Sequence, residues 1–289
     1  MIMDNKAEDE SSYYNSVKSE IDSYAKKWRL THIELIDNGR ESCVLKAHSE
    51  QYGNVIIKKR NTVKVIEDEF NTLSEYNGRY FCKIYGADLV NGILIEEQVQ
   101  PGTELIKEES LDRRLEVFGS IHKGLHIKPS MKYKFPTYYD WVSKATRYIE
   151  TREDHKELCM HMHKAEDICK ELFTLYPRKL LLHGDLHHYN ILRNNQNGYT
   201  LIDPKGVIGD SIFDIPRFLL NEMEDELDKK LFDKIIYAIT VIGEKLGIPT
   251  KIIKETFYIE MAMAECWMAE DGELVNLDKV IFAERILNA

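Results

Sequence analysis

The residues of this chain that could do chemistry gather in one stretch beyond its middle. Asp185 stands five positions before Asn190, and Asp203 comes eighteen positions after Asp185. Between Asn190 and Asp203 the sequence reads as two short strands joined by an Asn-Gly turn, which predicts a β-hairpin. Because a hairpin brings its open ends together, we expect Asn190 and Asp203 to lie side by side. Their side-chain oxygens would then hold a hard cation such as Mg²⁺, with the phosphates that it carries.

Asp185 is the candidate catalytic residue beside this expected metal site. In phosphoryl transfer a carboxylate accepts a hydrogen bond from the attacking hydroxyl and aims it at the γ-phosphorus of ATP, while an Asn and an Asp hold the metal. A loop aspartate that only satisfies backbone amides is the alternative. The spacing of Asp185, Asn190 and Asp203 favours the catalytic interpretation.

A lysine and an acid upstream would complete the phosphate site. Lys58 ends the strand-like run Val-Ile-Ile-Lys and would bridge the α- and β-phosphates, whereas Lys59 would point to the opposite face of the strand. Glu69 borders the apolar stripe of the helix that follows, so it is the expected ion-pair partner of Lys58, with Glu67 as the second choice. The alternatives are an ordinary edge-strand lysine and a solvated helix acid.

The elements that must position these residues fall into two parts. Residues 1–28 are expected to be helical, with a short helix near 17–28, or partly disordered. Strand-like runs are expected at Thr31–Asp37, Ser42–Ala47, Asn54–Lys58, Phe81–Tyr85 and Gly92–Glu96. A helix is expected over 63–73, and helical stripes dominate beyond Gln100-Pro101-Gly102. We therefore predict an α+β fold with an ATP-binding lobe at 1–98 and a helical lobe with the catalytic loop and acceptor pocket at 99–289.

Three motifs give this chain a resemblance to a known family. They are H-G-D-L-H-H-Y-N-I-L from His183, L-I-D-P-K-G-V-I-G-D-S-I-F-D from Leu201 and the less specific A-E-C-W-M-A-E-D-G-E from Ala264. The chain resembles the aminoglycoside phosphotransferase family, and within it the streptomycin and hydroxyurea kinase type. The resemblance implies a protein-kinase-like bilobal fold, with an antiparallel sheet and a helix in the small N-terminal lobe. It also implies an ATP- and Mg²⁺-dependent kinase that phosphorylates a hydroxyl of a small molecule.

The resemblance assigns roles to further residues. The backbone of Glu97 and Val99 would form the hinge that reads the adenine edge. Gly39 would lie in the loop that covers the phosphates, although a plain hairpin turn is the alternative because this loop has a single glycine. Asp214 would cap the helix that follows it and brace the catalytic loop.

The acceptor is expected to bind in the helical lobe, where acids are plentiful. Glu260, Glu270 and Asp271 are the expected acceptor-binding residues, against the alternative of solvated helix faces. The resemblance implies an aminoglycoside such as streptomycin as acceptor. A kinase for another small metabolite, such as a sugar or an amino alcohol, is one alternative, and a non-catalytic nucleotide-binding pseudokinase is another.

Composition narrows the range of partners. The net charge of -10 argues against nucleic acid as a partner and favours a cationic acceptor. The acidic start of the chain does not read as a signal peptide, and no apolar run approaches the ~20 residues that span a bilayer. The five cysteines are scattered and never spaced C-x-x-C, which is typical of a reduced, cytoplasmic protein. The sequence gives no indication of oligomeric state.

Overall fold

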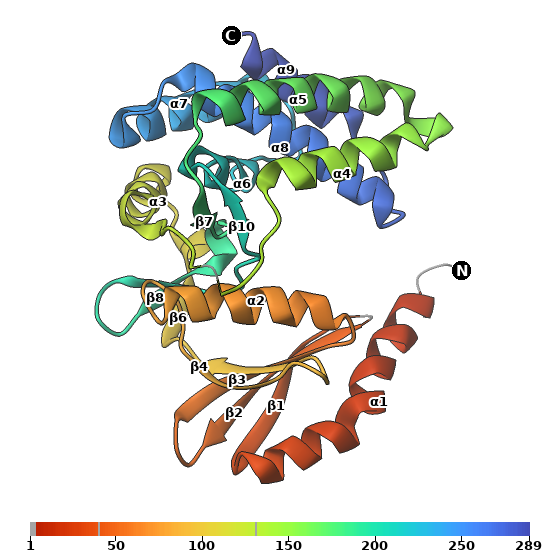
Figure 1. Ribbon diagram of the computed structural model, residues 1–289, viewed down its shortest axis with the longest axis vertical. Helices are drawn as coiled ribbons and strands as arrows, with labels where there is room; N and C mark the ends of the chain where they lie inside the picture. Colours follow the sequence, from red (N-terminus) through yellow and green to blue (C-terminus); the bar gives the residue numbers. More distant parts are fainter. Residues whose placement is uncertain (1–3, 40, 131) are drawn as a thin grey trace. The chain divides into compact units, whose positions relative to one another are not determined.

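The structure is a computed structural model, and it describes residues 4–39, 41–130 and 132–289. The chain divides into two compact units (Figure 1). The first unit comprises Met1–Thr103 and Leu192–Lys205, and the second comprises Glu104–Ile191 and Gly206–Ala289. These units differ from the expected lobes of 1–98 and 99–289, because the hairpin after the catalytic loop joins the N-terminal residues.

A five-stranded antiparallel sheet forms the centre of the first unit, in the order β1-β2-β3-β5-β4. Its elements are α1 (Asp4–Lys27), β1 (Leu30–Asn38), β2 (Ser42–Ser49), β3 (Gly53–Arg60), α2 (Val63–Tyr76), β4 (Ile84–Asp88) and β5 (Ile93–Glu97). The expected strands are confirmed, but β4 begins later than predicted. The reason is that Phe81 and Cys82 pair with Leu201 instead of continuing into the sheet.

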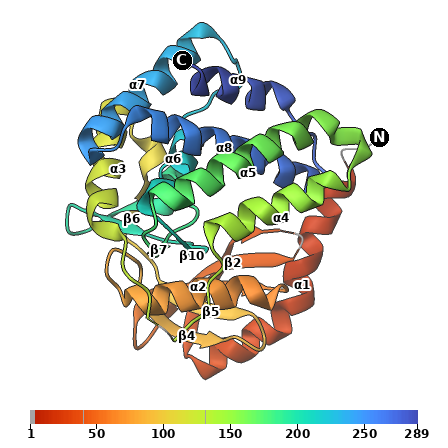
Figure 2. The same cartoon turned by 45° about the horizontal axis from the view of Figure 1, so that its top comes forward.

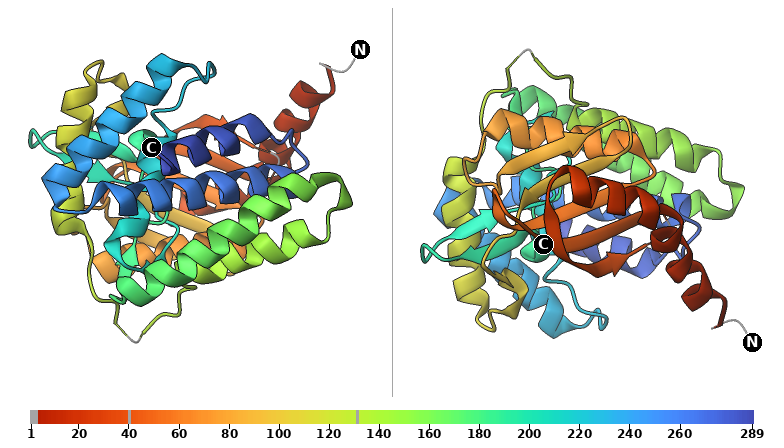
Figure 3. Two further views of the ribbon diagram at one scale, coloured as in Figure 1. Left: turned by 90° about the horizontal axis from the view of Figure 1, so that it is seen from above. Right: turned by 90° about the horizontal axis from the view of Figure 1, so that it is seen from below.

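The alternation of side chains along β3 gives the two faces of this sheet different tasks. Val55 and Ile57 join an apolar cluster with Ile21 and Tyr24 of α1, so α1 covers one face (Figure 3). The helix α1 is longer than the short helix expected near 17–28. Lys58 points to the other face, where α2 lies. One face of the sheet therefore packs into a hydrophobic core, and the other face carries charged side chains such as Lys58.

A second, three-stranded sheet joins the predicted hairpin to the first unit. It has the order β6-β8-β9, with β6 at Pro101–Glu104, β8 at Ile191–Asn194 and β9 at Tyr199–Leu201. Asn197 has a φ of 59°, a left-handed conformation that asparagine tolerates better than most residues. The Asn-Gly turn signal therefore marked the hairpin correctly.

The second unit is mainly helical (Figure 2). Its helices are α3 (Leu111–Leu125), α4 (Tyr138–Glu150), α5 (Lys156–Leu175), α6 (Pro216–Leu220), α7 (Lys229–Leu246), α8 (Thr250–Glu270) and α9 (Leu277–Leu287). Its strands are β7 (Leu180–Leu182) and β10 (Val207–Gly209), and its 3-10 turns are η1 (Leu105–Lys107), η2 (Glu153–His155), η3 (His188–Asn190) and η4 (Ser211–Asp214). Together the two units confirm the predicted α+β class.

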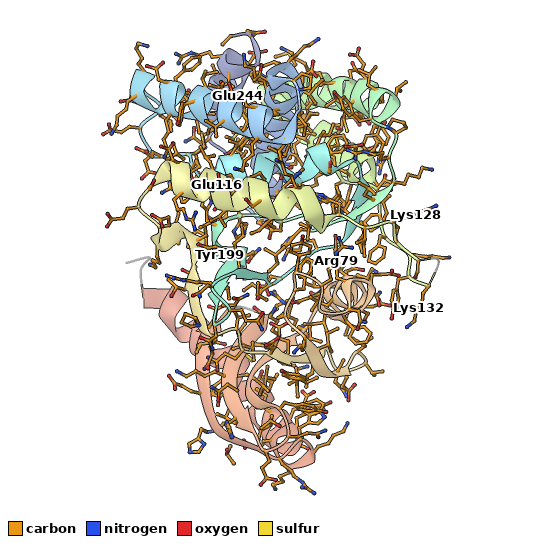
Figure 4. The ribbon with its side chains drawn as sticks, turned by 90° about the vertical axis from the view of Figure 1, so that its left-hand side faces the viewer. Arg79, Glu116, Lys128, Lys132, Tyr199 and Glu244 are labelled. Carbon is orange, nitrogen blue, oxygen red and sulfur yellow. The ribbon has the colours of Figure 1, made fainter. Side chains whose placement is uncertain are left out.

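The helix α8 is the central element of the second unit. It packs against α4, α5, α6, α7 and α9, and it is buried on nearly all sides, as expected of a core helix. At the periphery α3 lies against α7, and Figure 4 shows Glu116 of α3 and Glu244 of α7. Lys245 pairs with Glu116 by crossing α3 at Gly119, where a Cβ would lie only 2.2 Å from the lysine Cδ. A side chain at this position would therefore displace Lys245 from its path across α3.

All five cysteines are free thiols. Cys43, Cys82, Cys169 and Cys266 are buried, and Cys159 is partly buried. Burial raises the pKa of each of these thiols, to about 11 for Cys43 and about 12 for Cys266. None of the helices within the described ranges combines the length and apolar composition needed to cross a bilayer.

Candidate active site

Lys58 lies at the centre of a buried charge cluster in the first unit. It pairs in register with Val44 of β2 and Leu94 of β5, and its residue is only 3% exposed. Lys59 points to the α1 side, where its Nζ lies 3.5 Å from Glu20 and donates to the Asn91 carbonyl. The alternation predicted from sequence therefore distinguishes the two lysines correctly in space.

Three carboxylates surround the Lys58 ammonium. Its Nζ lies 2.5 Å from Glu69 Oε1 and 2.8 Å from Glu96 Oε1, and it also contacts Asp203. Glu69 comes from α2, as expected, whereas the neighbouring acids of α2 pair with Lys64. The structure therefore brings Lys58, Glu69 and Asp203 together within one unit, from strand, helix and hairpin.

The cluster carries more negative charge than one ammonium can balance. Burial disfavours a charged Lys58, but the three carboxylates outweigh this effect and raise the pKa of Lys58 well above its ordinary value. Burial raises the pKa of Glu69 and of Glu96, against the attraction of Lys58. Burial would also raise the pKa of Asp203, but Lys58 dominates and lowers it to about 2. The attraction of Lys58 thus favours the ionised form of Asp203.

A buried aspartate holds the catalytic loop in the second unit. Asp214 accepts hydrogen bonds from the backbone N–H of His183 and of Gly184, both at 2.8 Å, and its Oδ2 lies 2.9 Å from His126 Nε2. Asp214 therefore braces the loop as expected. The expected capping role is wrong, because the helix that follows, α6, has Ile215 at its N-cap and no side-chain cap hydrogen bond.

His122 packs next to His126, the histidine that contacts Asp214. Its Nε2 donates to the Ser211 carbonyl at 2.8 Å, and its ring meets that of His126 edge-on at 4.6 Å. Burial and the nearby His126 and Arg178 lower the pKa of His122 to about 3, against the opposing effects of the Ser211 carbonyl and Asp214. His122 is therefore a neutral histidine at physiological pH.

Asp185 and Asn190 are linked within the loop that Asp214 braces. The Asn190 side-chain nitrogen donates to the Asp185 carbonyl at 2.9 Å, so its amide oxygen is directed elsewhere. The Asp185 carboxylate lies 3.5 Å from His187 Nε2 and 3.3 Å from Arg217 Nε. This is a carboxylate fixed by the fold, with 19% of its side chain exposed.

The donor set at Asn190 and Asp203 fits Mg²⁺. Asp203 is an ionised carboxylate, and the fixed amide of Asn190 offers a neutral oxygen; hard oxygen ligands of these kinds suit Mg²⁺. Asn190 belongs to the second unit and Asp203 to the first, so the expected closeness of the two side chains stays a prediction. Glu69, Glu96 and Asp203 also offer oxygens within 4.8 Å of one another, but Lys58 already pairs with all three.

The expected nucleotide-binding segments occupy the ends of strands in the first unit. Glu97 ends β5, and its N–H donates to the Lys83 carbonyl at 2.8 Å. Glu97 and Val99 line a cavity of about 440 Å³, but neither Lys58 nor Asp203 lines it, so this cavity is distinct from the charge cluster. The N–H of Gly39 donates to the Ser42 carbonyl at 2.8 Å, as in a plain hairpin turn; Arg40 of this loop lies outside the described residues.

The three expected acceptor-binding acids do not gather in one place. Glu260 is buried and already bonded, since Tyr138 donates to it and Arg217 lies 2.9 Å away. Glu270 and Asp271 lie about 15 Å further along α8 at 1.5 Å per residue. Glu270 is 3.3 Å from Lys144, and Asp271 is exposed at the end of the helix.

A buried ionic cluster around Glu222, next to the catalytic loop, was not singled out from the sequence. Glu222, only 2% exposed, makes two hydrogen bonds with Arg114, at 2.7 and 2.6 Å. It also lies 2.7 Å from His188 Nε2 and 3.3 Å from Lys234 Nζ. Because His188 belongs to the same turn as Asn190, its contact with Glu222 helps to hold this candidate metal ligand in place. Nothing in the acid-rich stretch that begins at Glu222 distinguishes it from its solvated neighbours.

Comparison with known proteins identifies the family of this chain. The family model described as aminoglycoside/hydroxyurea antibiotic resistance kinase matches residues 27–272. The chain belongs to this family. A curated relative is the streptomycin 3''-kinase of Klebsiella pneumoniae, 38% identical over 58 residues. That match covers 20% of this chain and spans about a fifth of the relative, 21% of its length.

Solved structures show the same fold for this aminoglycoside/hydroxyurea kinase family member. The choline kinase LicA from Streptococcus pneumoniae matches with a TM-score of 0.69 at 15% identity, covering 95% of this chain and 99% of that chain. A thermostable mutant of aminoglycoside phosphotransferase APH(4)-Ia, in a ternary complex with AMP-PNP and hygromycin B, matches with a TM-score of 0.65 at 13% identity. That match covers 92% of this chain and 96% of the other. The protein-kinase-like fold predicted from the motifs is thereby confirmed.

Proposed function

We propose that this protein is an ATP- and Mg²⁺-dependent phosphotransferase that acts on a hydroxyl of a small molecule. The observation that carries the proposal is that Glu69 and Asp203 both contact the buried ammonium group of Lys58. A buried, fixed ammonium beside an ionised aspartate is suited to holding the phosphates of a nucleotide. The membership of the aminoglycoside/hydroxyurea kinase family and the shared fold support the same activity.

The chain's own residues would catalyse the reaction mainly by positioning. Lys58, kept in place by Glu69, would hold the α- and β-phosphates, and Glu97 and Val99 would present backbone groups to the adenine. Asn190 and Asp203 would hold Mg²⁺, which when bound neutralises charge on the phosphates. Asp185 would accept the proton of the acceptor hydroxyl as the oxygen bonds to the γ-phosphorus and the bond to ADP breaks.

The acceptor that we propose is an aminoglycoside such as streptomycin. Two observations support it: the printed description of the family, and the partial likeness to a streptomycin 3''-kinase. The net charge of -10 would also attract a cationic acceptor to the protein. Glu270 and Asp271, both at the surface end of α8, would contribute to this attraction.

The test is Asp185→Asn in an assay of ADP release with ATP, Mg²⁺ and streptomycin. Loss of a positioned general base lowers the rate by about 10²–10⁴-fold, and we expect kcat to fall by that order while ATP still binds. The matched control is Asp167→Asn, an exposed aspartate of α5 with 78% of its side chain exposed, which should keep wild-type turnover. Unchanged turnover in the Asp185 variant would exclude the proposed mechanism.

A panel of acceptors separates the proposal from its alternatives. Turnover of a sugar or an amino alcohol, with none of streptomycin, would keep the kinase and replace its acceptor. ATP binding that does not depend on Mg²⁺, with no turnover of any acceptor, would point to a non-catalytic nucleotide-binding protein. Growth of a streptomycin-sensitive host that expresses the chain gives an independent readout.

A further inference from the structure

The side chain of Arg217 occupies a cage of acidic and aromatic groups next to Asp185. Arg217 lies in α6, and its guanidinium faces two residues of α8 that are seven positions apart and so share one side of that helix. Its terminal nitrogen is 2.9 Å from Glu260 Oε1, and its Cζ lies 5.0 Å from the centre of the Trp267 ring. Its Nε is 3.3 Å from Asp185 Oδ1. One cation thus links the catalytic loop to the central helix.

The α8 side of this cage is rigid. Both carboxylate oxygens of Glu260 are engaged, one by Arg217 and the other by the hydroxyl of Tyr138. Glu260 is 3% exposed, and a buried carboxylate requires such partners to stay in place. The Trp267 ring adds a cation–π contact that restricts the guanidinium further. Arg217 is therefore held from α8, and the edge of its guanidinium that carries Nε is left facing Asp185.

The contact between Arg217 and Asp185 is an ion pair that is not yet a hydrogen bond. The Nε–H is buried and makes no hydrogen bond within the described part of the chain, although it lies within ion-pair distance of the carboxylate. Hydrogen bonds of catalytic groups are often poorly aligned without substrate and tighten when the substrate binds. In this geometry the Nε–H of Arg217 lies close to the Asp185 carboxylate without using one of its lone pairs.

We propose that Arg217 is a positioning residue that fixes the orientation of the Asp185 carboxylate toward the acceptor hydroxyl. Glu260, Tyr138 and Trp267 hold the guanidinium, and the guanidinium holds Asp185. Glu260 then serves Arg217 instead of the acceptor. This inference rests on the proposed function, because it assigns a partner to the proposed catalytic base.

Chemical rescue of Arg217→Ala tests the proposal. Truncation leaves an empty cage that matches a free guanidinium ion, so millimolar guanidinium chloride should raise the melting temperature of this variant. The rise should saturate with concentration, and sodium chloride at equal ionic strength should not reproduce it. With streptomycin as acceptor we expect a kcat roughly 10²-fold below wild type, with an unchanged KM for ATP, and partial recovery of kcat in guanidinium.

Two further variants keep the test decisive. Arg147→Ala removes an exposed arginine of α4 and should show neither the loss nor the rescue. If Arg217→Ala alone does not fold, the double variant Arg217→Ala with Glu260→Gln removes the unpaired buried carboxylate. That double variant should fold and show the kcat loss, and a wild-type kcat in it would overturn the positioning role.

The outcomes separate the two proposals. A folded Arg217→Ala variant with wild-type kcat, or one whose reduced kcat is not restored when guanidinium raises its melting temperature, would overturn the positioning role. Absence of a thermal response to guanidinium would overturn the cage itself. If the wild-type protein phosphorylates no acceptor, the proposed function fails, while the thermal response still decides whether the cage exists.

Discussion

Glu222→Gln should destabilise the second unit strongly, because this carboxylate balances three basic side chains in a buried place. Burial alone would raise the pKa of Glu222, but the hydrogen bonds from His188 and Arg114 outweigh it and lower the pKa from 4.5 to about 2. At about 1.4 kcal/mol per pH unit, this difference corresponds to roughly 3 kcal/mol of stability for the ionised form. Breaking a buried ion pair costs a similar ~3–5 kcal/mol.

The sign of this contribution sets its pH dependence. Since the folded pKa is depressed, the stabilisation is complete above about pH 4.5 and is lost as pH falls toward about 2. The unfolding free energy of Glu222→Gln, measured in urea, should lie about 3 kcal/mol below wild type at neutral pH, and the difference should shrink in acid. The melting temperature should fall by roughly 6–12 °C, at ~2–4 °C per kcal/mol.

Glu224→Gln is the matched control for this prediction. Glu224 also pairs with Lys234, at 2.9 Å, but its side chain is 51% exposed, so its loss should cost under ~1 kcal/mol. A neutral-pH difference below ~0.5 kcal/mol for Glu222→Gln would refute the reasoning, because surface substitutions reach that size. A difference that did not change with pH would attribute the loss to packing instead of charge.

Three further perturbations test other parts of the structure. Glu96→Gln should leave the unfolding free energy at about pH 8 equal to wild type or raise it by on the order of 1 kcal/mol, because it removes a surplus buried charge beside Lys58; a loss in urea titrations would contradict this. Thr137→Ala removes a capping box with Asp140 and should cost about 1 kcal/mol by thermal unfolding. His122, whose folded pKa is depressed to about 3, should make wild type lose roughly 2 kcal/mol between about pH 6.5 and 5; His122→Gln should flatten that slope.

The sequence predicted well what local pattern determines. Strand alternation separated Lys58 from Lys59, and helical spacing chose Glu69 among three consecutive acids. The Asn-Gly signal located the hairpin that carries Asp203 into the first unit. In each case the information lies within a few residues of the position concerned, so a single sequence contains it.

What the sequence did not reveal depends on packing between distant segments. Arg217 meets Glu260 and Trp267 only because α6 lies against α8, and no periodicity within either helix indicates that contact. The third carboxylate on Lys58, from Glu96, arises because β5 lies beside β3 in the sheet. Burial in such places depends on the whole fold, which local pattern does not encode.

The protected thiols make this protein easy to label at chosen places. Alkylating reagents react with thiolates, and the raised pKa of all five native cysteines leaves few of them ionised at neutral pH. Cysteines introduced at Val90, 85% exposed in the first unit, and at Leu274, 92% exposed in the second, would therefore accept fluorophores selectively. Such a dye pair would report by energy transfer whether nucleotide changes the separation of the two units, without prior removal of any native sulfur.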